Sequence, residues 1–266
     1  MAPFDIIESA GKSYRLFWHY RGYLARLAVI PIMIKIVCWN LVIAFGWQEQ
    51  YVRQAIVMLP SFFADGWMIS HFIRLIFLGQ TWPFKPTGNI EKDMEKLHSR
   101  ALGIMRGTVS YVVIKFLMAG LLGLLYMYMQ DNMQQIQNAE QDPSLFAFIS
   151  SMLILAFVLW LFKFTWFYIP AAINHPIQNL YKKIKGFKPA LFIAATWMIC
   201  FIPSLFLYKI FLEAFFGTPA EAPQDFATIQ IIQDTCSIIV DTIMLFITTG
   251  GIAYAFAQVL LPKEKK

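Results

Sequence analysis

Charged residues are scarce in this chain of 266 residues: they make up 14% of it, whereas 58% of the residues are hydrophobic. A soluble globular domain has roughly 45–50% apolar and about 25% charged residues. With so little charge, the folded chain cannot keep its apolar surface away from water, and its expected solvent is lipid. The composition therefore excludes an ordinary soluble domain. The net charge of +6 then comes from basic residues that set the orientation of the membrane spans, and it does not indicate nucleic-acid binding.

Residues that carry chemistry are also few. No Walker A, G-x-S-x-G, H-E-x-x-H or G-x-G-x-x-G motif occurs, and no two of the four histidines have i, i+4 spacing. The cysteines lie in apolar stretches without C-x-x-C spacing, which predicts small buried side chains and neither disulfides nor zinc ligands; they are Cys38, Cys200 and Cys236. We therefore expect no catalytic residue, no cofactor and no metal site.

Six apolar stretches are long enough to cross a hydrocarbon core of roughly 30 Å, which needs about 20 helical residues. The first begins near Leu24, is longer than the core of a signal peptide and has no A-x-A-like site, so we expect it to be retained. The fold class predicted is an all-α polytopic membrane protein, a single membrane domain over residues 1–266 with three helical hairpins. The predicted spans are Leu24–Trp47, Ala55–Leu78, Thr108–Met129, Leu145–Ile169, Ala190–Phe211 and Ile232–Leu261.

The segments between these spans alternate in charge. Basic residues precede the first span, lie in the loops after the second and fourth, and follow the sixth: Lys12, Arg15, Arg21, Lys85, Lys92, Lys96, Arg100, Arg106, Lys182, Lys183, Lys185, Lys188, Lys263, Lys265 and Lys266. The other three loops hold one basic residue and several acidic ones: Arg53, and Glu49, Asp131, Glu140, Asp142, Glu213, Glu221 and Asp225. Positive charge resists translocation, so we expect both termini to be cytoplasmic.

A basic, partly apolar segment leads into each odd-numbered span: YRLFWHYRGYLARL, EKLHSRALGIMRG and LYKKIKGFKPAL. Each is a candidate amphipathic helix on the inner leaflet, with its cations near anionic headgroups. The segment Ile90–Arg106 is predicted to form such a helix, because Asn89 is a capping residue and acidic residues follow it. The expected partners are therefore the bilayer, including anionic lipids, and a partner protein or second copy. The threefold pattern favours hairpins, but the identity between them is too low to establish a repeat.

Ionisable residues inside spans cost about 2.5–3.5 kcal/mol each on insertion, so they normally face protein or water. Four of them lie close enough to a membrane face for a long side chain to reach the interface; they are Arg74, Lys115, Lys163 and Lys209. The other candidates need a different explanation.

Lys35, Asp65 and Asp241 each lie about ten or eleven residues from a span end, which places them at similar depth. Two interpretations remain open: an ion pair that fixes helix register, and a proton or ion site in a polar pathway. Neither aspartate has a neighbouring carboxylate, which weakens a metal site or a paired acid and base. His71 and Arg74 complete the candidate intramembrane polar site. They share one helical face, and His71 is either a packing residue or a proton shuttle.

Residues that weaken helices occur inside the predicted spans. Pro31, Pro60 and Pro203 each remove a helical hydrogen bond, and Gly250 and Gly251 make a candidate helix break in the sixth span. Transporters build substrate sites from broken helices. The alternative is that these residues allow kinks and close packing of helices.

Three stretches carry a resemblance to known proteins: YRLFWHYRGYLARLAVIPI, FIRLIFLGQTWPF and FYIPAAINHPIQNLYKKIKGFKPAL. The chain resembles six-helix bacterial inner-membrane proteins of the YciC type and the membrane domain attached to some glycerophosphodiester phosphodiesterases. It departs from their pattern after Lys188, where a turn containing Trp and Thr and a charged residue are expected. No phosphodiesterase catalytic domain is present. The resemblance implies a bacterial inner-membrane location.

Two functions remain as hypotheses. The first is a non-enzymatic membrane protein that binds partner proteins or lipids in envelope maintenance or complex assembly, which the basic surface segments favour. The second is a small transporter or permease, with Lys35, Asp65 and Asp241 along its path. A polar cavity that reaches the aspartates favours transport, a solid apolar bundle favours a scaffold, and a groove open to lipid favours a hydrophobic ligand.

Overall fold

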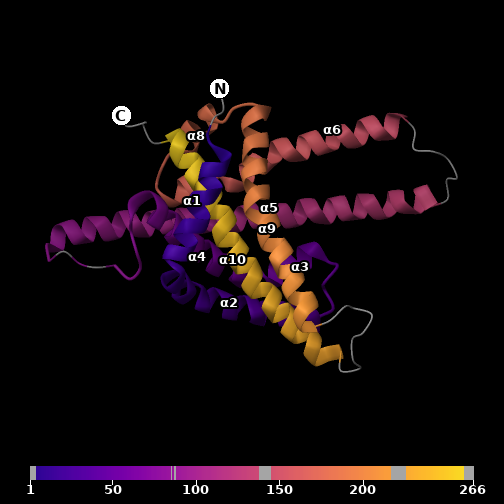
Figure 1. Ribbon diagram of the computed structural model, residues 1–266, viewed down its shortest axis with the longest axis horizontal. Helices are drawn as coiled ribbons and strands as arrows, with labels where there is room; N and C mark the ends of the chain where they lie inside the picture. The colour runs from indigo at the N-terminus through magenta and orange to yellow at the C-terminus, as the bar shows by residue number, and fades with distance from the viewer. Residues whose placement is uncertain (1–3, 85, 87, 138–144, 217–225, 261–266) are drawn as a thin grey trace.

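Helices make up the described part of the chain, which contains no strand (Figure 1). The computed structural model describes residues 4–84, 86, 88–137, 145–216 and 226–260. The α-helices are α1 (Ile6–His19), α2 (Arg21–Ala44), α3 (Tyr51–Val57), α4 (Leu59–Leu78), α5 (Ile90–Gln137), α6 (Leu145–Phe162), α7 (Tyr168–Ala172), α8 (Ile177–Lys183), α9 (Phe187–Phe216) and α10 (Phe226–Leu260), and η1 (Lys163–Trp166) is a 3-10 helix.

Within these residues, six helical segments are long and apolar enough to cross a membrane: Arg21–Ala44, Leu59–Leu78, Ile90–Leu124, Leu155–Ala172, Phe187–Ile210 and Ile231–Leu260. The predicted fold class is thereby confirmed. Several loop and tail residues used in the topology argument lie outside the described residues: Lys85, Glu140, Asp142, Glu221, Asp225, Lys263, Lys265 and Lys266.

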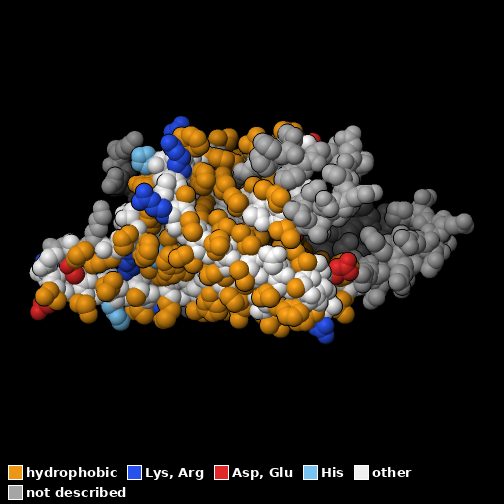
Figure 2. Space-filling view, turned by 90° about the horizontal axis from the view of Figure 1, so that it is seen from below, with side chains coloured by type: hydrophobic (Ala, Val, Ile, Leu, Met, Phe, Trp, Pro, Cys, Tyr) orange, Lys and Arg blue, Asp and Glu red, His pale blue; other side chains and the backbone are white. Residues whose placement is uncertain are grey.

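Large apolar side chains cover the outside of the molecule. Leu117, Leu153, Phe206 and Leu207 are each 65–68% exposed, and hydrophobic side chains predominate in the described part of the face that Figure 2 shows. A soluble monomer rarely exposes a continuous apolar surface of this extent. The exposed surface therefore matches a protein whose solvent is lipid.

Helices α4 and α10 form the centre of the bundle. Buried residues make up 61% of the apolar window of each, compared with 17–39% in the other four candidate spans. The Phe72 ring of α4 meets the Phe246 ring of α10 edge-on, with centroids 5.1 Å apart. Around them, α2 and α5 pack on α4, and α9 packs on α10. The charged residues of α4, Asp65 and Arg74, are therefore held inside the protein.

The N-terminal helix α1 packs along the last turns of α10. Ser13 Oγ donates to the carbonyl of Ile247 at 2.6 Å, and the Asp5 amide donates to Gln258 Oε1 at 2.8 Å. The start of α1 and the end of α10 therefore lie at the same end of the molecule (Figure 1). An even number of membrane crossings requires this arrangement.

Two of the predicted spans are not single α-helices. The second span, predicted from Ala55, consists of the short helix α3 and then α4, and Pro60 lies in the first turn of α4. Proline is compatible with that position because the amide it lacks has no helical acceptor there. Pro60 therefore begins a helix and does not kink one. The fourth span is also interrupted, by η1 between α6 and α7.

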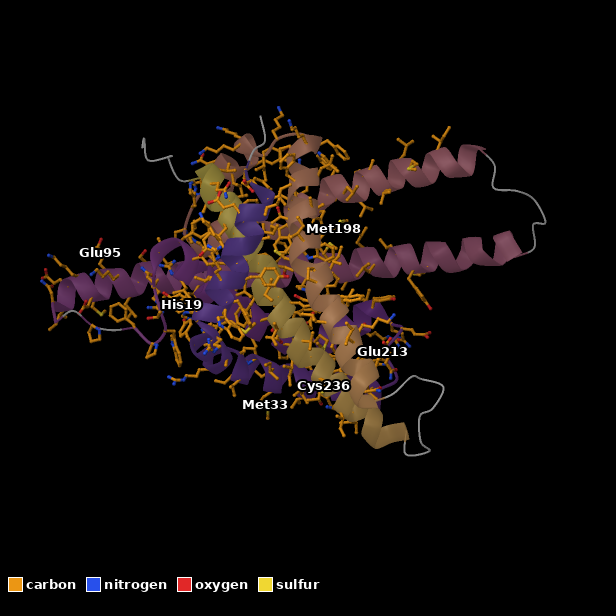
Figure 3. All side chains as sticks on the ribbon, in the orientation of Figure 1. His19, Met33, Glu95, Met198, Glu213 and Cys236 are labelled. Carbon is orange, nitrogen blue, oxygen red and sulfur yellow. The ribbon has the colours of Figure 1, made fainter. Side chains whose placement is uncertain are left out.

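The predicted surface helix Ile90–Arg106 and the third span are one continuous helix, α5. Asn89 caps it as expected, because its Oδ1 accepts the Lys92 amide at 3.2 Å. At 1.5 Å per residue its 48 residues extend about 72 Å, more than twice the roughly 30 Å of a hydrocarbon core. Its first turns, with Glu95, project beyond the other helices (Figure 3).

The other lead-in segments are not separate surface helices either. The first is divided at Tyr20 between α1 and α2, and the third is divided between α8 and α9 at Gly186, whose φ is +106°. The expected hairpins are present as α2 with α4 and α9 with α10. The remaining pair is α5 with the segment made of α6, η1 and α7. In this pair α7 packs on α5, whereas α6 packs on α9.

Candidate functional site

Lys35 of α2 lies between two carboxylates. Its Nζ is 2.9 Å from Asp65 Oδ2 of α4 and 3.1 Å from Asp241 Oδ2 of α10. The three residues come from three helices that pack on one another. The structure thus brings together the three ionisable residues that the sequence places at similar depth. We call them the Lys35 cluster.

The two carboxylates of the Lys35 cluster differ in burial. The side chains of Lys35 and Asp65 are 7% and 5% exposed, whereas that of Asp241 is 65% exposed. Asp65 Oδ1 has no hydrogen-bond partner among the described residues. A buried carboxylate with so few contacts depends on its cation, because only their attraction offsets the desolvation of both charges. Lys35 and Asp65 therefore form a buried ion pair, and Asp241 is the exposed member of the cluster.

A cavity of about 560 Å³ extends to Asp241. Its wall is mostly apolar and comes from α3, α4, α5, α9, α10 and the segment 162–168, with the rings of Trp166 and Trp197 among its residues. Lys115 is a second charged residue on the wall, with its Nζ 5.5 Å from the centre of the Tyr111 ring. We call this space the central cavity. Ligand pockets have volumes of roughly 300–1,000 Å³, and an apolar wall with few polar groups suits an amphiphilic molecule.

His71 and Arg74 are not part of the Lys35 cluster. They lie six and nine residues after Asp65, or about 9 and 14 Å further along α4. Arg74 Nη1 donates to the carbonyl of Ala172 at 2.8 Å, and His71 Nδ1 lies 3.4 Å from Arg100 Nη2. Both side chains are almost completely buried. Their contacts join α4 to α5 and α7, so the predicted set of five polar residues divides into two groups.

The candidate helix break at Gly250 and Gly251 is absent, because α10 is continuous through both. A Cβ on Gly250 would lie 2.3 Å from Ser13 Oγ, and one on Gly251 would lie 2.6 Å from Cys200 Sγ. The two glycines therefore allow α1 and α9 to approach α10 closely. The packing interpretation is correct, and the broken-helix interpretation was wrong.

Three features of the site region were missed. Lys163 was predicted to reach the membrane interface. Its side chain is instead 1% exposed and donates to the carbonyl of Gly186. Arg100, assigned to a loop by its charge, is 6% exposed. Gly103 and Gly107 lie against Arg74, Ser70 and Ala172, where a Cβ would clash. Their G-x-x-x-G spacing is the signal that predicts this close contact.

Comparisons with protein family models, with curated proteins and with solved structures find no match to this chain. In the described residues, no group of three His, Cys, Asp or Glu side chains is placed to hold a metal ion. The six apolar helices identify an integral, multi-pass membrane protein whose surface contacts lipid.

Proposed function

We propose that this chain is a non-enzymatic integral membrane protein that binds a lipid or another amphiphilic molecule in the central cavity. The observation that carries the proposal is the composition of the cavity wall, in which aromatic and aliphatic side chains surround one carboxylate, Asp241, and one ammonium, Lys115. Such a wall provides apolar contact for a hydrocarbon chain and a small polar region for a headgroup.

The setting of this function comes from the charge pattern and the resemblance. Basic loops after the second and fourth spans support a cytoplasmic position for both termini, and the resemblance supports a bacterial inner-membrane location. The wider role we propose there is envelope maintenance or the assembly of a complex, with a partner protein or second copy docking on the basic segments.

Filling the central cavity tests the proposal. Ala119 lines the cavity, whereas Leu117 on the same helix is 66% exposed and is not part of its wall. We expect Ala119→Phe to lower the amount of lipid that stays bound to the full-length protein through purification, and Leu117→Phe to leave it unchanged. Mass spectrometry of the extracted lipids, normalised to protein, measures this. Equal lipid content in both variants and the unsubstituted protein overturns the proposal.

A second candidate function is transport through the bundle, which the position of Lys35 between two carboxylates favours. Binding of an ion at the exposed Asp241 would alter the charge balance at Lys35 and couple that ion to a substrate. Asp241→Asn separates the two functions in proteoliposomes. Loss of a pH-dependent flux with the fold intact supports transport. Unchanged flux, or its absence in the unsubstituted protein, removes the support for this candidate.

A further inference from the structure

A second cavity, of about 600 Å³, lies between α4 and α5 and is separate from the central cavity. We call it the α4–α5 groove. The rings of Phe63, Trp67 and Trp82 and the side chains of Met105 and Val109 are part of its wall. Apart from Trp67, these side chains are 46–58% exposed, so the groove opens on the lipid-facing surface. Its apolar part therefore suits a hydrocarbon chain.

One end of the groove carries positive charge without a counter-charge. Arg100 and His71 line this end, and Arg74 lies behind it, bonded to the carbonyl of Ala172. Among the described residues, no carboxylate lies within ion-pair distance of either guanidinium; the ion pairs there involve only lysines. Buried charges are normally paired, so two buried arginines without an acidic partner call for an anion.

The donors of Arg100 are only partly used by the protein. Its Nη2 donates to the carbonyl of Thr81 at 2.7 Å and lies near His71 Nδ1, whereas its Nε and Nη1 have no protein acceptor in the described parts of the chain. Thr108, also on the groove wall and 9% exposed, has a hydroxyl without a hydrogen-bond partner among these residues. Guanidinium N–H groups match the oxygens of a phosphate.

The groove has the length and polarity of a lipid in one leaflet. Its wall runs along α5 from Leu97 to Val109, twelve residues or about 18 Å, close to half of a hydrocarbon core of roughly 30 Å. Arg100 belongs to the basic segment between the second and third spans, and the apolar wall continues from there into the span. A headgroup at Arg100 therefore places the acyl chain along Met105 and Val109.

From this arrangement we infer that the α4–α5 groove is a binding site for an anionic phospholipid. The headgroup phosphate accepts hydrogen bonds from Arg100, and one acyl chain lies in the apolar part of the groove. The inference concerns a site apart from the central cavity, so it stands or falls independently of the proposed function.

Native mass spectrometry of the full-length protein, titrated with phosphatidylglycerol or phosphatidylcholine, tests the inference. We expect tighter binding of phosphatidylglycerol, and a loss of about tenfold in its affinity in Arg100→Gln, because a hydrogen bond to a charged group is replaced by a weaker one. Lys96→Gln is the matched control: it removes one exposed positive charge from the same helix and should change the affinity little.

The variant Ala101→Phe tests the same site without changing either arginine. Ala101 lines the groove, so a phenylalanine there occupies the space of the acyl chain and should also lower phosphatidylglycerol affinity. Inorganic phosphate serves as the probe for a free-anion site, and it should compete weakly because it lacks the chain. Equal losses in Arg100→Gln and Lys96→Gln, no effect of Ala101→Phe, or full competition by phosphate would each overturn the inference.

Discussion

Replacing Lys35 by methionine tests whether the Lys35 cluster holds the bundle together. The substitution keeps an unbranched side chain but leaves Asp65, which is 5% exposed, without its cation. Removing one partner of a buried pair costs about 3–5 kcal/mol of unfolding free energy, because an uncompensated charge remains in an apolar environment. The measurement is the unfolding of detergent-solubilised full-length protein in increasing SDS, followed by Trp fluorescence or helical circular dichroism.

The geometry also predicts an order among the variants. Asp65→Asn should cost less than Lys35→Met, because Lys35 retains Asp241 at 3.1 Å. Asp241→Asn should cost least, about 1 kcal/mol or less, because its side chain is 65% exposed and a solvated ion pair contributes little.

The double variant Lys35→Met with Asp65→Leu provides the control for packing. It replaces the pair by apolar side chains, which is often neutral or stabilising, so it should recover most of the stability lost in Lys35→Met. Two results would refute the reasoning. One is a cost for Asp241→Asn equal to that for Lys35→Met, and the other is a double variant no more stable than the single one.

Two further predictions concern packing and accessibility. Gly107→Ala should destabilise the protein by about 1–3 kcal/mol, because the added Cβ would lie 2.7 Å from Ala172 Cβ. Gly120→Ala is the matched control: its added Cβ would meet no atom within 4 Å, so the substitution should be neutral or stabilise the protein by up to about 1 kcal/mol. The same SDS unfolding assay compares them, and equal effects would contradict the close contact of α5 with α7. In detergent, a maleimide should label the half-buried Cys236 before the buried Cys38 and Cys200; equal rates, measured by mass spectrometry of peptides, would contradict the described burial.

The spans were predictable because their signal lies in composition alone. The first, fifth and sixth predicted spans agree with the structure within three residues at each end. Counting residues from span ends also placed Lys35, Asp65 and Asp241 at one level, since helix rise is constant. Which of the carboxylates is buried was not predictable, because that depends on how α4 and α10 turn toward their neighbours.

Local breaks and the burial of individual charges were less predictable. The pair Gly250 and Gly251 is typical both of an unwound helix and of close packing, and only the positions of Ser13 and Cys200 decide between them. Arg100 stands in a charged segment, and its burial arises because Gly103 lets α5 approach α4 and α7. Such contacts join residues far apart in the chain, so a single sequence contains little information about them.

The proposed topology depends on the alternation of basic and acidic loops across six helices, and cysteine labelling in intact cells determines which loops lie outside. In a variant without the native cysteines, Glu49→Cys and Lys182→Cys each place one thiol at an exposed position, after the first and fourth spans respectively. With an impermeant maleimide added outside, we expect labelling at position 49 and none at position 182 until the membrane is opened. Labelling of both, or of position 182 alone, would contradict the proposed topology.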